Sequence, residues 1–228
     1  MKTALQWAGK ILLSCFIYSM GITLLYAIFP VFFTPLMAIR LFEQIIDKER
    51  DSKLKKEWVS IDQISPHMIQ AVIAAEDQKF LDHFGFDLEA INNALVGNRA
   101  GKSLKGGSTI SNQTAKNVFL WPGRNYLRKG LEAYFTLLIE ICWSKERIIE
   151  VYLNVIETGD GIYGVEAVAQ IFFNKSAKEL NKSESALMAA ILPNPLHWSP
   201  KNPSAYIYKR QSWILRNMNN LEPVGWGK

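Results

Sequence analysis

Cysteine and histidine are scarce in this sequence, which has only two cysteines and three histidines among 228 residues. Cys15 lies in a long apolar run and Cys142 in the main part of the chain, so we expect no disulfide within a domain. The histidines, His67, His83 and His197, are isolated, and no cysteine–histidine cluster has the spacing of a zinc site. These absences exclude a disulfide scaffold and a zinc-binding module.

Charge is absent from Ile11 to Ile39, a run longer than the ~20 residues that cross a bilayer. Lys2 and Lys10 precede this run and no acidic residue does, which predicts a cytoplasmic N-terminus. The remaining chain would then lie outside the cytoplasmic (inner) membrane, in the periplasm. A cleavable signal peptide is the alternative, but the run is too long and no small-residue cleavage site follows it.

Paired strand patterns, repeats and low-complexity tracts are also missing, whereas apolar residues recur at helical spacing along most of the chain. The sequence therefore predicts a mainly α-helical fold. We expect a cytoplasmic tip and transmembrane anchor at 1–40, a charged linker at 41–60, one domain at 61–222 and a tail at 223–228. The charged residues from 43 to 57 predict either a solvated linker or a juxtamembrane helix. The chain is too short for a second enzymatic domain.

The net charge is +5 and the isoelectric point is about 9.1. An excess of lysine and arginine favours an anionic partner, which could be a nucleic acid, a phospholipid surface or a phosphorylated substrate. The charge alone does not distinguish among these partners.

Glu76 interrupts an otherwise apolar helical face. Ser65 followed by Pro66 predicts the start of a helix, with serine as N-cap and proline in the first turn. The residues at helical spacing that share the face of Glu76 are Ile69, Val72, Ile73 and Phe80. A carboxylate on such a face is costly unless it is paired or lies in a cleft, where it can accept a proton. Simple exposure at the end of the helix is the other interpretation.

Four segments extend this observation: EDQKFLDHFG at 76–85, GGSTISNQTAKN at 106–117, RKGLE at 128–132 and KERIIEVYLN at 145–154. Their order and spacing resemble the peptidoglycan glycosyltransferases, specifically the monofunctional biosynthetic transglycosylases. The resemblance runs from about residue 64 to residue 221. One departure is Asn112, where the family usually carries glutamine or methionine.

The resemblance implies a lysozyme-like α-helical glycosyltransferase domain that polymerises lipid II into β-1,4-linked glycan and releases polyprenyl diphosphate with inversion. It implies Glu76 as the general base and Glu132 as a second catalytic carboxylate near the leaving diphosphate. The implied substrate-binding residues are Asp77, Phe80, His83, Ser108, Thr109, Gln113, Lys116, Arg124, Arg128 and Lys129. From the residues alone, a plain helix cap is the preferred interpretation of Ser108 and Thr109.

No cofactor is required by this chemistry and no protein metal site is expected, although Mg²⁺ or Mn²⁺ can assist at the diphosphate. The implied partners are lipid II, the nascent glycan strand, membrane lipid and other cell-wall synthesis or division proteins, with no nucleic acid. The segment from Val118 to Trp121 is either core or a membrane-dipping edge, and the resemblance favours the edge. A lysozyme-like lytic transglycosylase or hydrolase, and a membrane-anchored scaffold, are the alternative functions.

Overall fold

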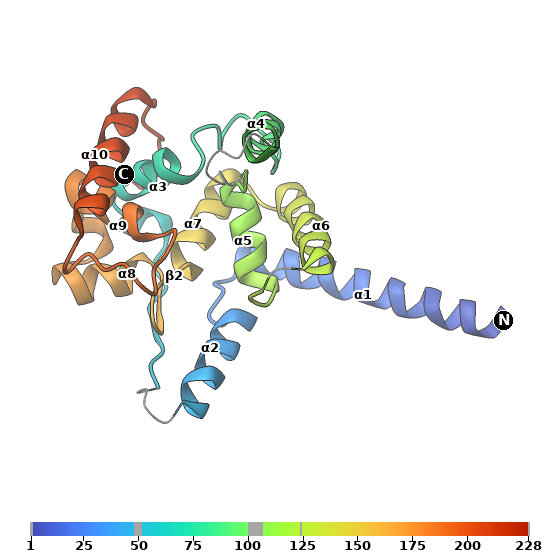
Figure 1. Ribbon diagram of the computed structural model, residues 1–228. Helices are drawn as coiled ribbons and strands as arrows, with labels where there is room; N and C mark the ends of the chain where they lie inside the picture. The colour runs from blue at the N-terminus through green and yellow to red at the C-terminus, as the bar shows by residue number, and fades with distance from the viewer. Residues whose placement is uncertain (1, 48–51, 100–106, 124, 228) are drawn as a thin grey trace.

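The computed structural model describes residues 2–47, 52–99, 107–123 and 125–227. Helices dominate, and the N-terminal part of one of them, α1 (Lys2–Ile28), projects away from all the others (Figure 1). Its segment Gln6–Ile28 is long and apolar enough to cross a membrane, and the helix ends just before Pro30. The predicted apolar helix and the mainly α-helical class are confirmed.

A second helix, α2 (Pro35–Ile46), runs across the predicted boundary at residue 40. Thr34 caps it, and Leu36 and Met37 are buried in the hydrophobic core. The start of the predicted charged segment is therefore helical, which agrees with its interpretation as a juxtamembrane helix. One face of this short helix is apolar and packs on the domain, while Arg40 pairs with Glu157 at 3.0 Å.

The main body contains eight further α-helices and three short helical turns among the described residues. These are η1 (Ile61–Gln63), α3 (Pro66–Glu76), α4 (Leu88–Arg99), α5 (Ile110–Phe119), α6 (Tyr126–Cys142), α7 (Lys145–Val155), α8 (Val165–Val168), η2 (Ala169–Phe173), η3 (Ala177–Glu179), α9 (Lys182–Ile191) and α10 (Ala205–Asn220). The N-cap predicted at Ser65 is confirmed, and Ser144 and Asn181 are the N-caps of α7 and α9. Phe80, predicted on the helical stripe of Glu76, lies beyond the end of α3.

A small sheet also forms, so the prediction of no strand pairs is wrong. Strand β3 (Ile162–Tyr163) lies between β1 (Lys55–Lys56), which is parallel to it, and β2 (Glu157–Gly159), which is antiparallel. Strands of two or three residues are too short to show an alternating pattern. The turn before β3 needs glycine, because Gly161 has φ +67° and an added Cβ would lie 2.3 Å from the Lys53 carbonyl oxygen.

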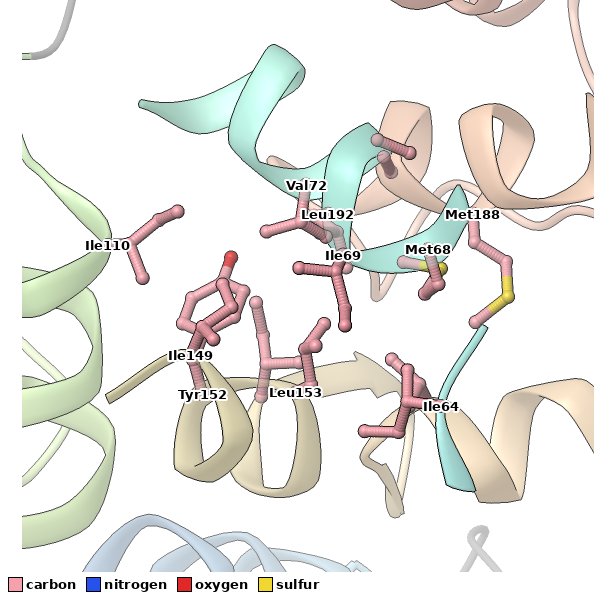
Figure 2. Close-up of a cluster of buried hydrophobic side chains, with 14 of the residues drawn as sticks. Ile64, Met68, Ile69, Val72, Ile110, Ile149, Tyr152, Leu153, Met188 and Leu192 are labelled. Atoms are coloured by element: carbon pink, nitrogen blue, oxygen red, sulfur yellow. The ribbon is translucent and has the colours of Figure 1, made fainter. Parts of the chain in front are cut away.

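The core forms where α3, α5, α7 and α9 meet (Figure 2). Ile69 and Val72 of α3 face Ile149 and Leu153 of α7 in this cluster, and all four side chains are buried. This packing fixes the C-terminal end of α3 beside α5. The fold thereby places Glu76, the last residue of α3, within reach of side chains from other helices.

Candidate active site

Glu76 is held by two side chains from distant parts of the chain, and its own side chain is 14% exposed. Gln113 Nε2 donates to Glu76 Oε2 at 2.9 Å, and Arg210 Nη2 donates to Oε1 at 3.4 Å. The buried Tyr152 hydroxyl donates to Gln113 Oε1 at 3.4 Å, so the glutamine amide is itself oriented. The carboxylate is therefore positioned rather than free at a helix end, and it keeps access to solvent.

Asp77 braces the loop after α3 against α5. Its Oδ1 lies 3.0 Å from His83 Nε2, and its Oδ2 accepts the Ile110 backbone N–H at 3.0 Å. Burial raises the pKa of the Asp77 carboxyl, although the contacts with His83 and Ile110 oppose the shift. Phe80 is fully buried beneath the Lys145 ammonium, 4.7 Å from the ring centroid. Phe80 and His83 thus support Glu76 from within the fold.

Two cavities meet near Glu76. The first has a volume of about 420 Å³ and the second about 340 Å³. The polar residues that line the first are Arg40, Gln113, Lys116, Asn117, Arg128 and Glu157. Those that line the second include Glu76, Asp77, Lys79, Asn93 and Ser108, together with the aromatic side chain of Trp213. Because Gln113 lines the first cavity and Glu76 the second, the hydrogen bond between them joins the two.

The first cavity is cationic. Burial lowers the pKa of the Lys116 ammonium, and the nearby Glu132 carboxylate opposes the shift. Glu132 is buried, accepts from Arg128 Nη1 at 2.6 Å and also contacts Lys129 Nζ. Arg128 Nε is buried without a hydrogen-bond partner within the described ranges. Three cations surround one carboxylate, so the cluster keeps an excess of positive charge for an anionic ligand.

Thr109 is the N-cap of α5 and uses its hydroxyl within the fold. Thr109 Oγ1 accepts the Asn112 N–H at 3.1 Å and donates to the Gly85 carbonyl oxygen at 2.7 Å. Asn112 Oδ1 accepts the Thr109 N–H, and its Nδ2 donates to Gly85 and to Thr136 Oγ1 at 3.1 Å. Asn112 therefore completes a capping box. Its buried side chain, which replaces the usual glutamine or methionine of the family, lies behind the site. Ser108, in contrast, is exposed at the second cavity.

Arg124 lies outside the described residues. Among the residues that the structure does describe, no group of three His, Cys, Asp or Glu side chains is placed to hold a metal ion. Both carboxylate oxygens of Glu132 already accept from cations. The side chains of this cluster fit an anion better than a metal ion held by the protein alone.

Sequence reasoning missed the contribution of α10, which supplies Arg210 to Glu76 and Trp213 to the second cavity. It also missed Arg40 and Glu157, which pair beside the first cavity. Arg210 is 134 residues from Glu76, and one arginine on a helix carries no signal of such a contact. Only the packing of α10 on α3 and α9 brings Arg210 and Trp213 to the site.

The segment from Val118 to Trp121 is mostly core, which corrects the predicted membrane-dipping edge. Val118 is 3% exposed and Leu120 is 2% exposed, whereas Trp121 is 37% exposed. The strongly exposed apolar residues come later, at the start of α6, where Tyr126 is 97% exposed and Leu127 is 70% exposed. A contact with a lipid surface would therefore involve Trp121 and α6.

Comparison with known proteins decides the family. A sequence model described as Transglycosylase matches residues 42–219. The chain belongs to the transglycosylase family. The matched range begins within α2 and ends near the end of α10, so it includes Arg210 and Trp213, whereas Arg40 lies just before it. The lysozyme-like helical fold expected from the sequence is thereby confirmed.

Several curated relatives of this transglycosylase carry the name biosynthetic peptidoglycan transglycosylase. The protein from Bdellovibrio bacteriovorus is 50% identical over 217 residues, which cover 95% of this chain and 86% of the relative. The protein from Bacteroides thetaiotaomicron is 49% identical over 96% of this chain and 88% of the relative. The protein from Salmonella agona is 51% identical over 93% of this chain and 88% of the relative.

Proposed function

We propose that this transglycosylase is a peptidoglycan glycosyltransferase that polymerises lipid II into β-1,4-linked glycan strands. The observation that supports this proposal best is the hydrogen bond between Glu76 and Gln113, which joins a cavity bearing a carboxylate to a cationic cavity. A sugar acceptor and a donor with a diphosphate leaving group need these two environments side by side. The names of the relatives point to the same substrate class.

Glu76 acts as the general base in this proposal. The acceptor N-acetylglucosamine occupies the second cavity, where Trp213 offers an aromatic face and Ser108 and Asp77 offer polar groups. Glu76 removes the proton from the acceptor 4-hydroxyl as that oxygen attacks the anomeric carbon of the donor. Direct attack opposite the departing diphosphate inverts the anomeric configuration, which fits a base and an anion site in adjoining cavities.

The cations of the first cavity stabilise the leaving polyprenyl diphosphate. Lys116 supplies a point charge and Arg128 a planar fork suited to phosphate oxygens. Negative charge grows on the departing oxygen, so these contacts strengthen in the transition state. Glu132 cannot attract the anion itself; it orients Arg128 and Lys129 through its two oxygens. Arg124 is assigned the same role on the sequence resemblance alone. A divalent cation bound mainly by the diphosphate oxygens can add to this charge.

Residues at and behind the two cavities support the site in the same proposal. Gln113 keeps Glu76 in place, Thr109 and His83 tie the loop after α3 to α5 and to Asp77, and Phe80 fills the interior beneath this loop. Their replacement would act through the geometry of Glu76 and not through a lost substrate contact.

We place the protein in the cell inner membrane, with α1 as a single span, the N-terminus in the cytoplasm and the catalytic domain in the periplasm. The apolar helix and the lysines that precede the apolar run support this arrangement. The partners would then be lipid II, the growing glycan and membrane lipid, along with other cell-wall synthesis or division proteins.

The test is incubation of the full chain with labelled lipid II, followed by separation of glycan polymer from monomer. The wild type should form polymer, and Glu76→Gln, which keeps the shape of the side chain, should lose nearly all activity. The matched control is Glu222→Gln at an exposed position, which should behave like the wild type. Cleavage of finished glycan without polymerisation would instead identify a lytic enzyme or hydrolase. Wild-type activity in Glu76→Gln would show that Glu76 is not the general base.

A further inference from the structure

The outer end of α1 is held by an arginine of the catalytic domain. Pro30 follows the helix and has no backbone N–H, so the Tyr26 carbonyl oxygen lacks the donor that a continuing helix would supply. Arg147 of α7 replaces it: Nε donates to the Tyr26 carbonyl oxygen at 3.0 Å, and Nη2 donates to the Phe29 carbonyl oxygen. Arg147 Nη1 pairs with Glu150 of its own helix. A cation at this end of a helix also interacts favourably with the helix dipole.

A lysine of the domain binds the chain just beyond the helix. Lys56 Nζ donates to the Val31 carbonyl oxygen at 2.8 Å. Both cations lie over the ring of Trp58, with Lys56 Nζ 5.4 Å and the Arg147 guanidinium carbon 5.1 Å from its centroid. We refer to Arg147, Lys56 and Trp58 as the exit clamp.

The exit clamp adds a second point of attachment to α1. Further inside the apolar span, Ser19 Oγ lies 2.6 Å from Tyr134 Oη, and Trp143 Nε1 donates to the Thr23 carbonyl oxygen at 2.7 Å. These contacts attach α1 to α6 and its C-cap, whereas Arg147 attaches it to α7. Ser19 and Phe29 are ten residues apart, which is about 15 Å of helix. Two attachment points at this separation, on different helices, prevent α1 from rocking against the domain.

Helix α7 also connects the exit clamp to the proposed general base. Arg147 lies in its first turn, and Tyr152 follows five residues later, about 7.5 Å along the helix. The Tyr152 hydroxyl donates to Gln113, and Gln113 donates to Glu76. One helix therefore carries both the attachment of the membrane helix and the support of the carboxylate.

We propose that Arg147 is a positioning residue for the reaction at the membrane: by locking the outer end of α1 to α7, it fixes the direction in which Glu76 faces the bilayer. This inference rests on the proposed function, because it takes Glu76 and a lipid-linked substrate from that reaction. The membrane helix and the catalytic domain then move as one body. A substrate whose lipid chain lies in the same bilayer meets the carboxylate at a fixed height, whereas a loose joint would leave only a fraction of the molecules productive.

A comparison of two media tests the positioning. In vesicles that contain lipid II with a full-length chain, Arg147→Gln should lower kcat about tenfold or more, because fewer molecules hold Glu76 at the substrate. With lipid II bearing two isoprene units in detergent, no bilayer fixes the height of the substrate, and the variant should match the wild type. Arg216→Gln, at an exposed position of α10, should match it in both media. Equal losses in both media, or no loss in either, would overturn the proposal.

Pro30→Ala separates the clamp from simple satisfaction of the helix end. Alanine restores an N–H that can donate to the Tyr26 carbonyl oxygen, but this bond lies within α1 and does not reach α7. We therefore expect Arg147→Gln combined with Pro30→Ala to remain as impaired in vesicles as Arg147→Gln. Recovery of the wild-type kcat in the double variant would show that Arg147 only supplies a missing donor, and the positioning role would be refuted.

A distance measurement tests the joint without the reaction. Nitroxide labels at Leu12→Cys and Tyr126→Cys, both exposed, report on α1 against the domain in nanodiscs once Cys15 and Cys142 are replaced by alanine. The distance distribution should be narrow with Arg147 and broader in Arg147→Gln; equal widths would contradict the joint. The expected broadening in a protein that never polymerises lipid II would refute the proposed function and retain the joint.

Discussion

Arg210 and Gln113 hold the Glu76 carboxylate from two sides, and each contacts a different oxygen. A base that must take one proton from a bound sugar benefits from this fixed orientation. The position of Glu76 on an apolar helical face was readable in the sequence. The two partners were not, because α5 and α10 reach Glu76 only through tertiary packing.

Replacement of Arg210 should show the value of that orientation. Arg210→Ala removes one partner of Glu76, and we expect kcat to fall about 10–100-fold, because small misplacements of a catalytic group are costly. The KM for lipid II should change less. Arg216→Ala, at an exposed position on the same helix, is the control and should leave the kinetics unchanged. An Arg210→Ala enzyme with wild-type kcat would show that Gln113 suffices.

Lys116 is the cation that best isolates the role of the first cavity. Its ammonium is buried at the cavity wall, and Lys116→Ala should lower kcat by about 10²-fold, as removal of one preorganised electrostatic contact does. The effect on lipid II affinity should be smaller. Lys201→Ala, at an exposed site, controls for net charge. If Lys201→Ala proves equally damaging, general attraction of the basic protein to lipid explains the data better.

The charge on Lys116 predicts how kcat/KM and the free energy of unfolding change with pH. Burial lowers the pKa of Lys116, so its positive charge is lost at a lower pH than the ~10.4 of an exposed lysine. The ratio kcat/KM should therefore fall as the pH rises through that lowered value, and Lys116→Arg should remove the fall. Stability has the opposite sign: the unfolded chain binds this proton more tightly, so the free energy of unfolding rises over that window. A decline in rate there that persists in Lys116→Arg would assign it to another group.

Asn112 supplies a stability prediction. Its side chain caps α5 and bonds to Gly85 and Thr136 in the interior. Asn112→Ala should lower the free energy of unfolding by about 1–3 kcal/mol, because a cap is lost and buried polar groups lose a partner. Urea unfolding followed by circular dichroism measures this change. Asn202→Ala, in an exposed turn, should stay within experimental error of the wild type.

Helices that begin at a capping residue could be predicted from the sequence. Elements that depend on contacts with distant parts of the chain could not. Ser65, Ser144 and Asn181 carried local signals that fix helix starts whatever surrounds them. The sheet of β1, β3 and β2 has no such signal, because its strands are only two or three residues long and β1 pairs with a strand about 100 residues away. The bounds of helix α2 were hard to predict, because the helix begins in the charge-free run and ends in the charged segment.

Truncation distinguishes α1 from α2. A chain that begins at residue 30 keeps Val31, Leu36 and Met37, all of which are buried in the core. A chain that begins at residue 41 loses them and the Arg40–Glu157 pair, which costs several kcal/mol at ~1.5–3 kcal/mol per buried side chain. That loss approaches the total stability of a typical domain, ~5–15 kcal/mol. We expect a cooperative thermal transition for the longer chain only; equal melting temperatures would show that α2 is dispensable.

On the scale of the whole molecule, the membrane helix and the apolar surface of the domain lie together. Helix α1 runs beside α6 in Figure 1, and Ser19 of α1 contacts Tyr134 of α6. Ser19 lies well inside the apolar span, so α6 lies beside a part of α1 that would be within the membrane. Tyr126 and Leu127 extend this surface from the start of α6. The domain would therefore reach into the outer leaflet, where the chains of its proposed substrates lie.

Vesicle binding by the domain without α1 tests this arrangement. The chain that begins at residue 30 should cosediment with anionic vesicles at low salt, because exposed apolar residues and basic side chains such as Lys129 act together. Added salt should weaken the binding by screening the charges. Leu127→Ser should reduce the bound fraction severalfold, since Leu127 is 70% exposed.

The control for this change is Ile171→Ser in η2, an aliphatic residue that is 48% exposed. Helix α8, which directly precedes η2, lies far from α1 in Figure 1. The change also removes an exposed aliphatic side chain, so it should leave vesicle binding unchanged if the contact surface lies around α6. Equal losses in the two variants would mean that binding follows total exposed apolar area and has no preferred face. In that case α1 alone would set the orientation of the active site toward the bilayer.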